Sequence, residues 1–266
     1  MHRRNLQILT LLAVVALSAA CGGGGGGGGG VSTPVVRNAA VGGIWEGTAT
    51  ISGQGVSALI GLVAEDGRAH FIQDDGVQYW GTVRSSGNTI TASFDGAVEI
   101  GDSFIDGSTS GTGSLNGTIQ ERSTITATVA FTTARGTRSS STISLRYNAL
   151  YERDSSLATV SGNYTDAFAP GSDIVNVSSS GVLFGQSLGA SCVINGAVTV
   201  INPAYNAYEI QYSYANCTGV DSVLNGAAFS GIATLDNTEN PEVAIAGLQG
   251  RVSGALYSVI FLYQRT

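Results

Sequence analysis

No lysine occurs among the 266 residues, so all 12 basic residues are arginine. Charged residues make up 12% of the chain, about half of the ~25% that is usual in soluble proteins. Because 19 residues are acidic, the net charge is −7. A protein that binds nucleic acid needs a basic surface to displace the counterions of the phosphates. The composition therefore argues against nucleic acid as a partner.

Histidine and cysteine are scarce, with two and three residues. His2 lies at the N-terminus, which leaves His70 alone in the body of the chain, between acidic turns, where we interpret it as a strand-edge residue. One histidine does not make a zinc site with two cysteines that pair. We therefore expect no metal, no cofactor and no catalytic residue.

Proline is rare at four residues, whereas the 38 glycines are about twice the usual ~7% share. Hydrophobic residues make up 43%, which is enough for a core and excludes wholesale disorder. Beyond the N-terminal region, no stretch keeps a helical period for more than about two turns. Only Asp154–Val160 is expected to form a short helix or turn. The pattern excludes a helical fold.

The N-terminus carries a short basic segment, Met1–Arg4, followed by an apolar run from Leu6 to Ala20. As a helix this run would span about 22 Å, which is too short for a hydrocarbon core of ~30 Å. It is typical of a signal peptide rather than of a permanent membrane span. We assign the signal peptide to residues 1–20.

The apolar run ends in Leu17-Ser18-Ala19-Ala20-Cys21, where small residues directly precede a lone cysteine. This motif resembles the lipobox of bacterial lipoproteins, although Leu17 lies one place further from the cysteine than in the commonest pattern. The resemblance implies cleavage before Cys21, lipidation of its thiol and acylation of its amine, for example by palmitate. The alternative is an ordinary secretory signal that is cut after Ala20 and leaves a free thiol.

Nine consecutive glycines, Gly22–Gly30, follow the cysteine. Polyglycine has no side chain to bury and a high backbone entropy, so it does not fold alone. We expect residues 21–42 to form a lipidated cysteine and a Gly-rich tether with a reach of roughly 25 Å. In the lipoprotein family, aspartate after the cysteine marks the inner membrane. Gly22 in that place implies an anchor in the outer membrane, on either its periplasmic or its surface face.

From Gly43 onward, apolar and polar residues alternate between turn residues, which predicts an all-β fold. The segment Thr124–Thr132 alternates strictly, and Ser141–Tyr147 and Tyr208–Tyr214 do the same. A period of two with one apolar face is typical of a half-buried antiparallel strand. Because the turn signals lie close together, the sequence predicts an antiparallel meander that forms a barrel or a sandwich.

The sequence of the folded part also contains an internal repeat. Gly43-Ile44-Trp45 is similar to Gly162-Asn163-Tyr164, and Ser114–Gly117 is similar to Val223–Gly226, with offsets that fall from 119 to 109. We therefore predict two tandem repeats of seven to eight strands each, over 43–150 and 151–266. The aromatic residue after glycine on the first strand is weakly similar to lipocalin-like barrels and to lobed β-barrel receptor lipoproteins.

The last strand expected, Ala255–Tyr263, is apolar on both faces. We interpret it as a buried strand that closes the fold. A membrane-spanning barrel is the alternative, but most other strands lack the paired aromatic girdles around a lipid-facing band.

Two cysteines remain after Cys21, and an exported chain meets an oxidising periplasm, so we expect Cys192 and Cys217 to pair. Their midpoint falls in the turn-like segment Asn202–Asn206. A hairpin there brings the cysteines opposite each other if a bulge near Gly196 or Ala215-Asn216 corrects the alternation. The closed loop would contribute ~3 kcal/mol in the chain-entropy model. A redox pair is less consistent with the sequence, which has no CxxC spacing.

Aromatic residues gather on a few predicted strands and are the candidates for a ligand-facing surface. Such residues pack as plain core or line a pocket, because tyrosine offers apolar area together with a hydroxyl. The candidate residues are Trp45, Trp80, Tyr208, Tyr212 and Tyr214.

Three functions are consistent with these features. The first is an outer-membrane lipoprotein whose non-catalytic β domain binds a small ligand or an envelope protein. The second is a structural or adhesive surface module without a cavity. The third is an envelope hydrolase that uses turn carboxylates, such as Asp74 and Asp75, and it requires two of them to face each other across a cleft.

We expect Cys21→Ala to abolish incorporation of labelled palmitate and to release the protein from the membrane fraction. The far-ultraviolet circular dichroism should stay unchanged, because the tether separates the anchor from the fold. Undiminished membrane retention of the variant would contradict the lipobox assignment.

Overall fold

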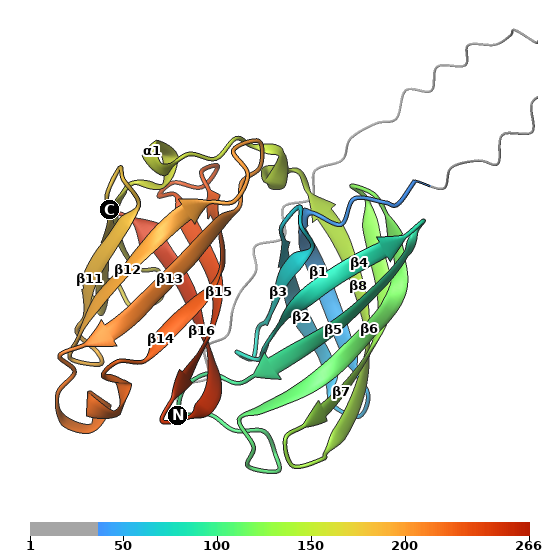
Figure 1. Cartoon of the computed structure of the whole chain (residues 1–266), viewed down its shortest axis with the longest axis horizontal. Coiled ribbons are helices and arrows are strands. Elements are labelled where there is room, and N and C mark those ends of the chain that lie inside the picture. The colour runs from blue at the N-terminus through green and yellow to red at the C-terminus, as the bar shows by residue number, and fades with distance from the viewer. Residues whose placement is uncertain (1–36) are drawn as a thin grey trace, which may run out of the picture.

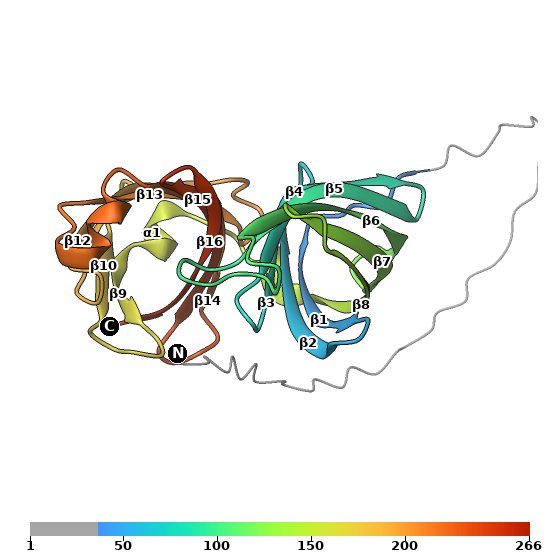
Figure 2. The ribbon, with the colours of Figure 1, turned by 90° about the horizontal axis from the view of Figure 1, so that it is seen from below.

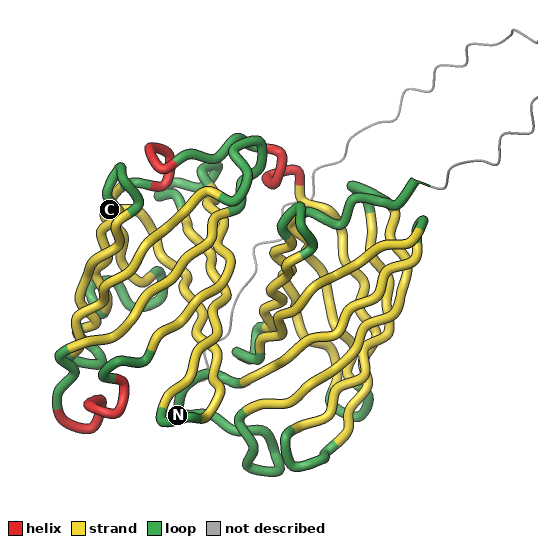
Figure 3. Tube along the Cα trace, in the orientation of Figure 1, coloured by secondary structure: helices red, strands yellow, loops and turns green. Residues whose placement is uncertain are grey.

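The computed structural model describes residues 37–266, and these form two antiparallel β-barrels side by side (Figures 1 and 3). Both barrels are closed and each has eight strands. The predicted all-β class and the two tandem repeats are confirmed, and the barrel is the correct one of the two architectures considered. The signal peptide, Cys21 and the tether as far as residue 36 lie outside the described residues.

The first barrel is an eight-stranded meander in which each strand pairs with the next, and β1 closes the ring by pairing with β8. Its boundary expected between residues 150 and 151 falls in the short helix η1 (Ala149–Glu152). The strands are β1 (Gly43–Ile51), β2 (Gly55–Val63), β3 (Arg68–Gln73), β4 (Gln78–Ser86), β5 (Thr89–Ala97), β6 (Ser110–Gln120), β7 (Thr124–Thr133) and β8 (Arg138–Asn148).

The second barrel repeats this order, and β16 closes it by pairing with β9. The prediction of a closing strand at the C-terminal end is therefore confirmed. Two short helices accompany the strands: α1 (Leu157–Val160), within the predicted segment, and η2 (Gly219–Leu224). The strands are β9 (Gly162–Asp166), β10 (Asp173–Val177), β11 (Val182–Ser187), β12 (Cys192–Val200), β13 (Tyr208–Ala215), β14 (Ala228–Asp236), β15 (Val243–Val252) and β16 (Ala255–Arg265).

Alternation along the strands decides which side chains fill each barrel. On β7, Ile125, Ala127 and Phe131 are buried in the interior, whereas the threonines between them face outward. Glycine allows the strands to coil closely around the interior. At Gly47, for example, a Cβ atom would collide with the carbonyl oxygen of Ser144 on the neighbouring strand.

The same closure recurs at one end of both barrels. Trp45 on β1 donates its indole N–H to the Val41 carbonyl at 3.2 Å, and Tyr164 on β9 donates its hydroxyl to the Val160 carbonyl at 2.8 Å. In each case the acceptor lies four residues before the aromatic residue, and the two pairs are 119 residues apart. This is the offset predicted from the sequence for the start of the repeats.

Two details of the sequence prediction are wrong. Ala39 and Val41, assigned to the tether, are buried in the core of the first barrel because they cover its end. Ser114–Gly117 lies in β6, whereas Val223–Gly226 lies in η2 and the turn after it, so these segments are not equivalent. The offset from β6 to β14 is 118, because β5 and β6 are separated by the same length of chain as β13 and β14.

The disulfide between Cys192 and Cys217 is present, with the Cα atoms 4.1 Å apart. The register pairs Ile194 with Tyr214, so strict continuation would place Cys192 opposite Asn216. Asn216 instead adopts a left-handed φ of 55°, after which Cys217 turns into the core beside Cys192. Of the two bulge positions considered, Ala215-Asn216 is therefore the correct one.

Figure 2 shows the two barrels side by side, and a third apolar core joins them. Ile60 and Leu62 on β2 and Ile72 on β3 point out of the first barrel and belong to the same cluster as Ile232 on β14 and Ile260 on β16. We call this contact the inter-barrel interface. It explains why β2 and β3 are buried on both faces.

Hydrogen bonds at the inter-barrel interface fix how the barrels meet. The backbone N–H of Ser258 donates to the Val98 carbonyl at 2.9 Å, and its hydroxyl lies 3.2 Å from the Ala97 carbonyl. Gln78 Oε1 accepts the backbone N–H of Leu248 at 3.1 Å. Because backbone groups of both halves pair across the contact, the two barrels form one unit.

A substitution at Gly247 on β15 tests the inter-barrel interface, because a Cβ atom there would collide with the ring of His70. We expect Gly247→Ala to lower the free energy of unfolding by about 1–3 kcal/mol, as is usual for overpacking. Gly189→Ala is the matched control, since nothing lies within 4 Å of its Cβ position. Equal unfolding midpoints for the two variants in urea would contradict a close contact.

Candidate binding sites in the barrel interiors

Each barrel encloses a small cavity, of about 40 Å³ in the first and about 50 Å³ in the second. Both lie among inward-facing side chains of the strands. A water molecule needs roughly 10–15 Å³ of such space, so each cavity has room for a few waters. The two walls differ in their polar groups.

The wall of the first cavity is mostly aliphatic and aromatic, with polar side chains from β3, β4 and β8. These are Gln73, Tyr79 and Ser141. The other lining residues are Ala49, Leu59, Ala69, Phe71, Gly81, Val83, Ala92, Phe94, Leu115, Val129 and Ile143.

Gln73 is the unusual member of this wall. It is the last residue of β3 and follows Ala69 and Phe71 on the inward face. Its side chain is only 2% exposed, and among the described residues its Nε2 has no hydrogen-bond partner. A buried amide without a partner loses its hydration without compensation. The wall of the first barrel therefore includes one buried hydrogen-bond donor without a partner.

The cavity lies near the end of the first barrel opposite Val41 and Trp45. In a meander, the connections after β1, β3, β5 and β7 meet at this end. They carry five acidic residues and one basic residue, so we call it the acidic end. The charged residues are Asp74, Asp75, Glu99, Asp102 and Asp106, with Arg135 as the cation.

Two acids lie close to the mouth of the cavity. Asp74 Oδ1 accepts the Ser57 hydroxyl at 2.5 Å. Burial raises the pKa of Asp75, and it also raises the pKa of the Tyr79 hydroxyl, with a further contribution from Asp75. Both shifts favour the protonated, neutral forms of Asp75 and Tyr79.

An aromatic cluster narrows the acidic end. Tyr79 packs edge-on against Phe94 and Phe131, with ring centroids 5.4 Å apart in both pairs. Phe104, from the connection between β5 and β6, reaches Phe131 at 5.5 Å.

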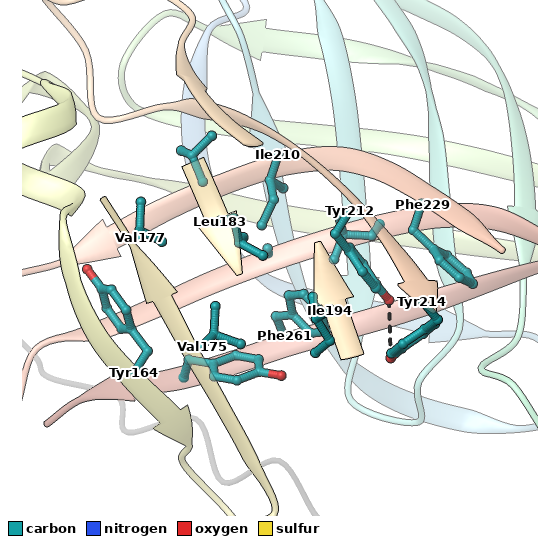
Figure 4. Close-up of a cluster of buried hydrophobic side chains, with 14 of the residues drawn as sticks. Tyr164, Val175, Val177, Leu183, Ile194, Ile210, Tyr212, Tyr214, Phe229 and Phe261 are labelled. Atoms are coloured by element: carbon teal, nitrogen blue, oxygen red, sulfur yellow. Dashed lines mark hydrogen bonds between the residues drawn. The ribbon is translucent and has the colours of Figure 1, made fainter. Parts of the chain in front are cut away.

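The second cavity has hydroxyl groups on its wall, but they are already engaged. Tyr208 donates to the Ser156 carbonyl at 3.5 Å, Tyr263 to Asp173 at 2.9 Å, and Thr234 to the Asn206 carbonyl at 2.9 Å. The Tyr164 hydroxyl donates to Val160, as described above. The rest of the wall is apolar (Figure 4): Val160, Val175, Val177, Leu183, Val198, Ile210, Ala233, Ala244, Ala246 and Phe261.

The position that corresponds to Gln73 differs in the second barrel. Ser187 is the last residue of β11, as Gln73 is the last residue of β3, and both strands have six residues. Ser187 is buried, and its hydroxyl accepts the backbone N–H of Ala190 at 3.4 Å. It is not part of the second cavity wall.

The structure separates the five predicted ligand-facing aromatics. Tyr208 lines the second cavity. Tyr212 and Tyr214 lie in the same barrel but are not on the cavity wall. The Tyr212 ring stacks on Phe229, and the Tyr212 hydroxyl donates to the Tyr214 hydroxyl at 3.5 Å (Figure 4). Trp45 is fully buried beside the closed end of the first barrel and is not on the cavity wall.

Trp80 points out of the first barrel, since its neighbour Tyr79 points in. It stacks on His70 with ring centroids 5.7 Å apart. His70 is not a strand-edge residue, as the sequence suggested, because a closed barrel has no edge and the second barrel covers this face. It is 1% exposed, and its Nε2 lies 2.6 Å from Gln78 Oε1.

Sequence reasoning missed Gln73. The available signal was the inward pattern Ala69-x-Phe71-x-Gln73, in which an amide interrupts an apolar face. Among residues 37–266, no group of three or more His, Cys, Asp or Glu side chains is arranged to hold a metal. In the same residues, none of the helices has the length and hydrophobicity needed to cross a bilayer.

No family model matches the sequence, and no curated protein matches it. Among solved structures, the chain is similar to a crystal structure from Bacteroides fragilis that is described as a "putative outer membrane protein". The identity is 12%, the TM-score is 0.30, and the match covers 85% of this chain and 98% of that chain. A likeness at this level supports no statement about the function of this chain.

Burial lowers the pKa of His70 from 6.5 to about 4. The unfolded chain therefore takes up a proton near pH 6.5, whereas the folded chain does so only near pH 4. Stability is full above pH 6.5 and should fall by about 1.4 kcal/mol per pH unit as the pH drops toward 4, roughly 3 kcal/mol in all. Urea unfolding of the wild type and His70→Gln at a series of pH values isolates this contribution. Parallel profiles for the two proteins would contradict a buried neutral imidazole.

Proposed function

We propose that this chain is a lipoprotein anchored in the outer membrane whose β domain binds small apolar molecules in the cell envelope without transforming them. The observation that carries the binding part is the pair of mostly apolar cavities, one in each barrel. Ligand sites in proteins are concave and mostly apolar, with few polar groups that orient the ligand. Both interiors have this character on a small scale.

The anchor is supported by the sequence of the N-terminal residues. A basic segment, a short apolar run and small residues before Cys21 form the lipobox-like signal, and Gly22 favours the outer membrane. The described chain begins with Arg37, which pairs with Glu121 at 3.2 Å close to the closed end of the first barrel. The proposed anchor therefore joins the domain at the end opposite the acidic end.

Binding without catalysis is supported by the residues on the walls. General acid–base and nucleophilic catalysis need a group that exchanges protons near neutral pH, or an activated nucleophile. Neither cavity is lined by His, Cys, Asp or Glu. His70 is enclosed in the inter-barrel interface, away from both cavities.

Xenon is a suitable probe of both cavities, because it binds apolar space without a hydrogen bond. We expect dissolved xenon to shift the ¹³C-methyl resonances of Leu115 and Ile143 in the first barrel, and of Val177 and Leu183 in the second. The measurement uses the full chain carrying Cys21→Ala, so that no detergent is present.

Filling each cavity separately provides the controls. Ala92→Leu should remove the xenon response of the first barrel only, and Ala244→Leu that of the second only. Ala197→Leu places the same change on an exposed strand position and should alter neither response. If the unfilled protein shows no response in either barrel, the proposed binding function is wrong.

A further inference from the structure

We infer that the second barrel docks on a bilayer surface of zwitterionic phospholipid with the end at which η2 lies. We call this end the η2 end, and it is formed by the connections after β9, β11, β13 and β15. This docking goes beyond the proposed binding function and does not depend on either cavity. The placement of exposed apolar side chains, the charges around them and the length of chain before Arg37 carry it.

Five large apolar side chains are exposed at the η2 end. Phe168 lies in the β9–β10 connection, Ile174 at the start of β10, Leu188 in the β11–β12 connection, and Val220 and Val223 on η2. Their exposed fractions range from 47% at Phe168 to 88% at Val220. Apolar side chains that gather at one end of a molecule are typical of an interaction site.

The acidic end of the first barrel lies on the same side of the molecule as the η2 end (Figures 1 and 2). Near this side, the N–H of Ser258 at the start of β16 donates to the Val98 carbonyl just after β5. Toward the other side, Arg68 at the start of β3 pairs with Glu209 near the start of β13 at 3.2 Å. The two barrels therefore present their corresponding ends in the same direction.

Exposed apolar residues are concentrated on this shared side. Of the ten large apolar residues that are exposed among residues 37–266, eight lie there. The acidic end contributes Val56 beside the β1–β2 turn, and Ile100 and Ile105 in the β5–β6 connection. The other two are Val182 and Phe184 on β11. Single exposed apolar residues need no explanation, but this bias indicates that one side meets an apolar environment.

The form of the η2 end favours a lipid surface over a folded partner. Its apolar side chains project from separate connections that extend into open space. At Gly171, Gly189 and Gly219, in three of these connections, a Cβ atom would have no neighbour within 4 Å. A fluid bilayer interface closes around each projecting side chain, whereas a stable protein interface needs about 800 Å² of complementary surface on each partner.

The charges decide which lipid surface fits. Asp221 is the one charged residue in the four connections of the η2 end, which are residues 167–172, 188–191, 216–227 and 253–254. The adjoining strand ends add Asp166, Asp173 and Arg251. The neighbouring acidic end carries five carboxylates and one guanidinium. An anionic bilayer attracts basic segments and would repel these carboxylates. A zwitterionic phospholipid has no net charge and exposes its ammonium group outermost, where a carboxylate meets it favourably.

The length of chain before Arg37 allows the η2 end to reach the membrane of the proposed anchor. Residues 22–36 separate Cys21 from Arg37, which lies near the opposite end of the first barrel. Fully extended, a chain of this length spans about 50 Å. The longest strands have 11 residues and rise about 36 Å. The anchor and the η2 end can therefore occupy the same bilayer.

Flotation with vesicles tests the docking in the absence of the lipid anchor. The mature chain, residues 21–266 with Cys21→Ala, is mixed with vesicles of phosphatidylcholine, or with vesicles that also contain phosphatidylglycerol. We expect binding to phosphatidylcholine that is nearly independent of salt, because apolar side chains make the contact. At low salt, binding to the anionic vesicles should be weaker by about threefold or more.

Phe168→Ser and Leu188→Ser each remove one projecting side chain and should weaken binding to phosphatidylcholine by about fivefold. Phe184→Ser and Val182→Ser are the matched controls and should leave it unchanged. Phe184 is 52% exposed, close to the 47% of Phe168, but it lies on the wall of the barrel. Since all four side chains are exposed, the variants should keep the unfolding midpoint of the parent chain.

Methyl resonances give a second readout that needs no substitution in the barrel. The same mature chain is bound to phosphatidylcholine nanodiscs that contain a nitroxide-labelled lipid. The nitroxide should broaden the methyl resonances of Leu188, Val220 and Val223. The methyl resonances of Val182, which begins β11 at the opposite end, should stay sharp.

Several results would overturn the docking. These are no flotation with phosphatidylcholine, equal losses for Phe168→Ser and Phe184→Ser, stronger binding to the anionic vesicles, or broadening of Val182 as strong as that of Val220. Sedimentation velocity identifies a different occupant: a dimer that Phe168→Ser dissociates would mean that a second copy covers the η2 end. The xenon experiment is independent of these results, so the binding function and the docking fail or stand separately.

Discussion

The inter-barrel interface is the contact on which the rest of the structure depends. Strands β2 and β3 carry apolar side chains on both faces, so the first barrel alone would expose Ile60, Leu62 and Ile72 to water. The apolar side chains on the outward faces of β14 and β16 would likewise be exposed to water in the second barrel alone. Because burial of these side chains drives the barrels together, neither half is a complete folding unit.

Polar groups give this contact its geometry. Gln78 Oε1 accepts the Leu248 N–H and therefore acts as an acceptor toward His70, which must then donate from Nε2. Burial lowers the pKa of His70 and favours the neutral imidazole, whereas the hydrogen bond to Gln78 acts in the opposite direction. Since the strand side chains in the contact face outward from the barrels, the contact leaves both interiors separate and free to differ.

Much of the fold follows from local sequence pattern. The alternation of apolar and polar residues correctly predicted a strand at Thr124–Thr132. The symmetric position of the two cysteines about a turn-like segment correctly predicted the β12–β13 hairpin. The similarity of Trp45 and Tyr164 marked the start of each repeat, because both aromatic residues make the same hydrogen bond to a preceding valine. These features depend on neighbours in the sequence or on one turn.

The inter-barrel interface and the cavities could not be predicted in this way, because they depend on which outward faces meet. His70 and Trp80 have the correct alternation for an exposed strand face, and only the second barrel buries the histidine. Tyr212 and Tyr214 have the same inward parity as Tyr208, yet only Tyr208 lies where the interior is not filled. Whether an inward-facing side chain belongs to the packed core or to the cavity wall depends on its position along the barrel axis, and the alternation does not encode that position.

The pair of equivalent positions at the ends of β3 and β11 has a consequence for how such a protein diversifies. A repeated domain holds two copies of one compartment, and a change in one copy leaves the other intact. Glutamine at residue 73 and serine at residue 187 show this asymmetry at matching strand ends. The chain thus combines a barrel with a buried glutamine at this strand end and a barrel with a buried serine there, and each is open to selection independently of the other.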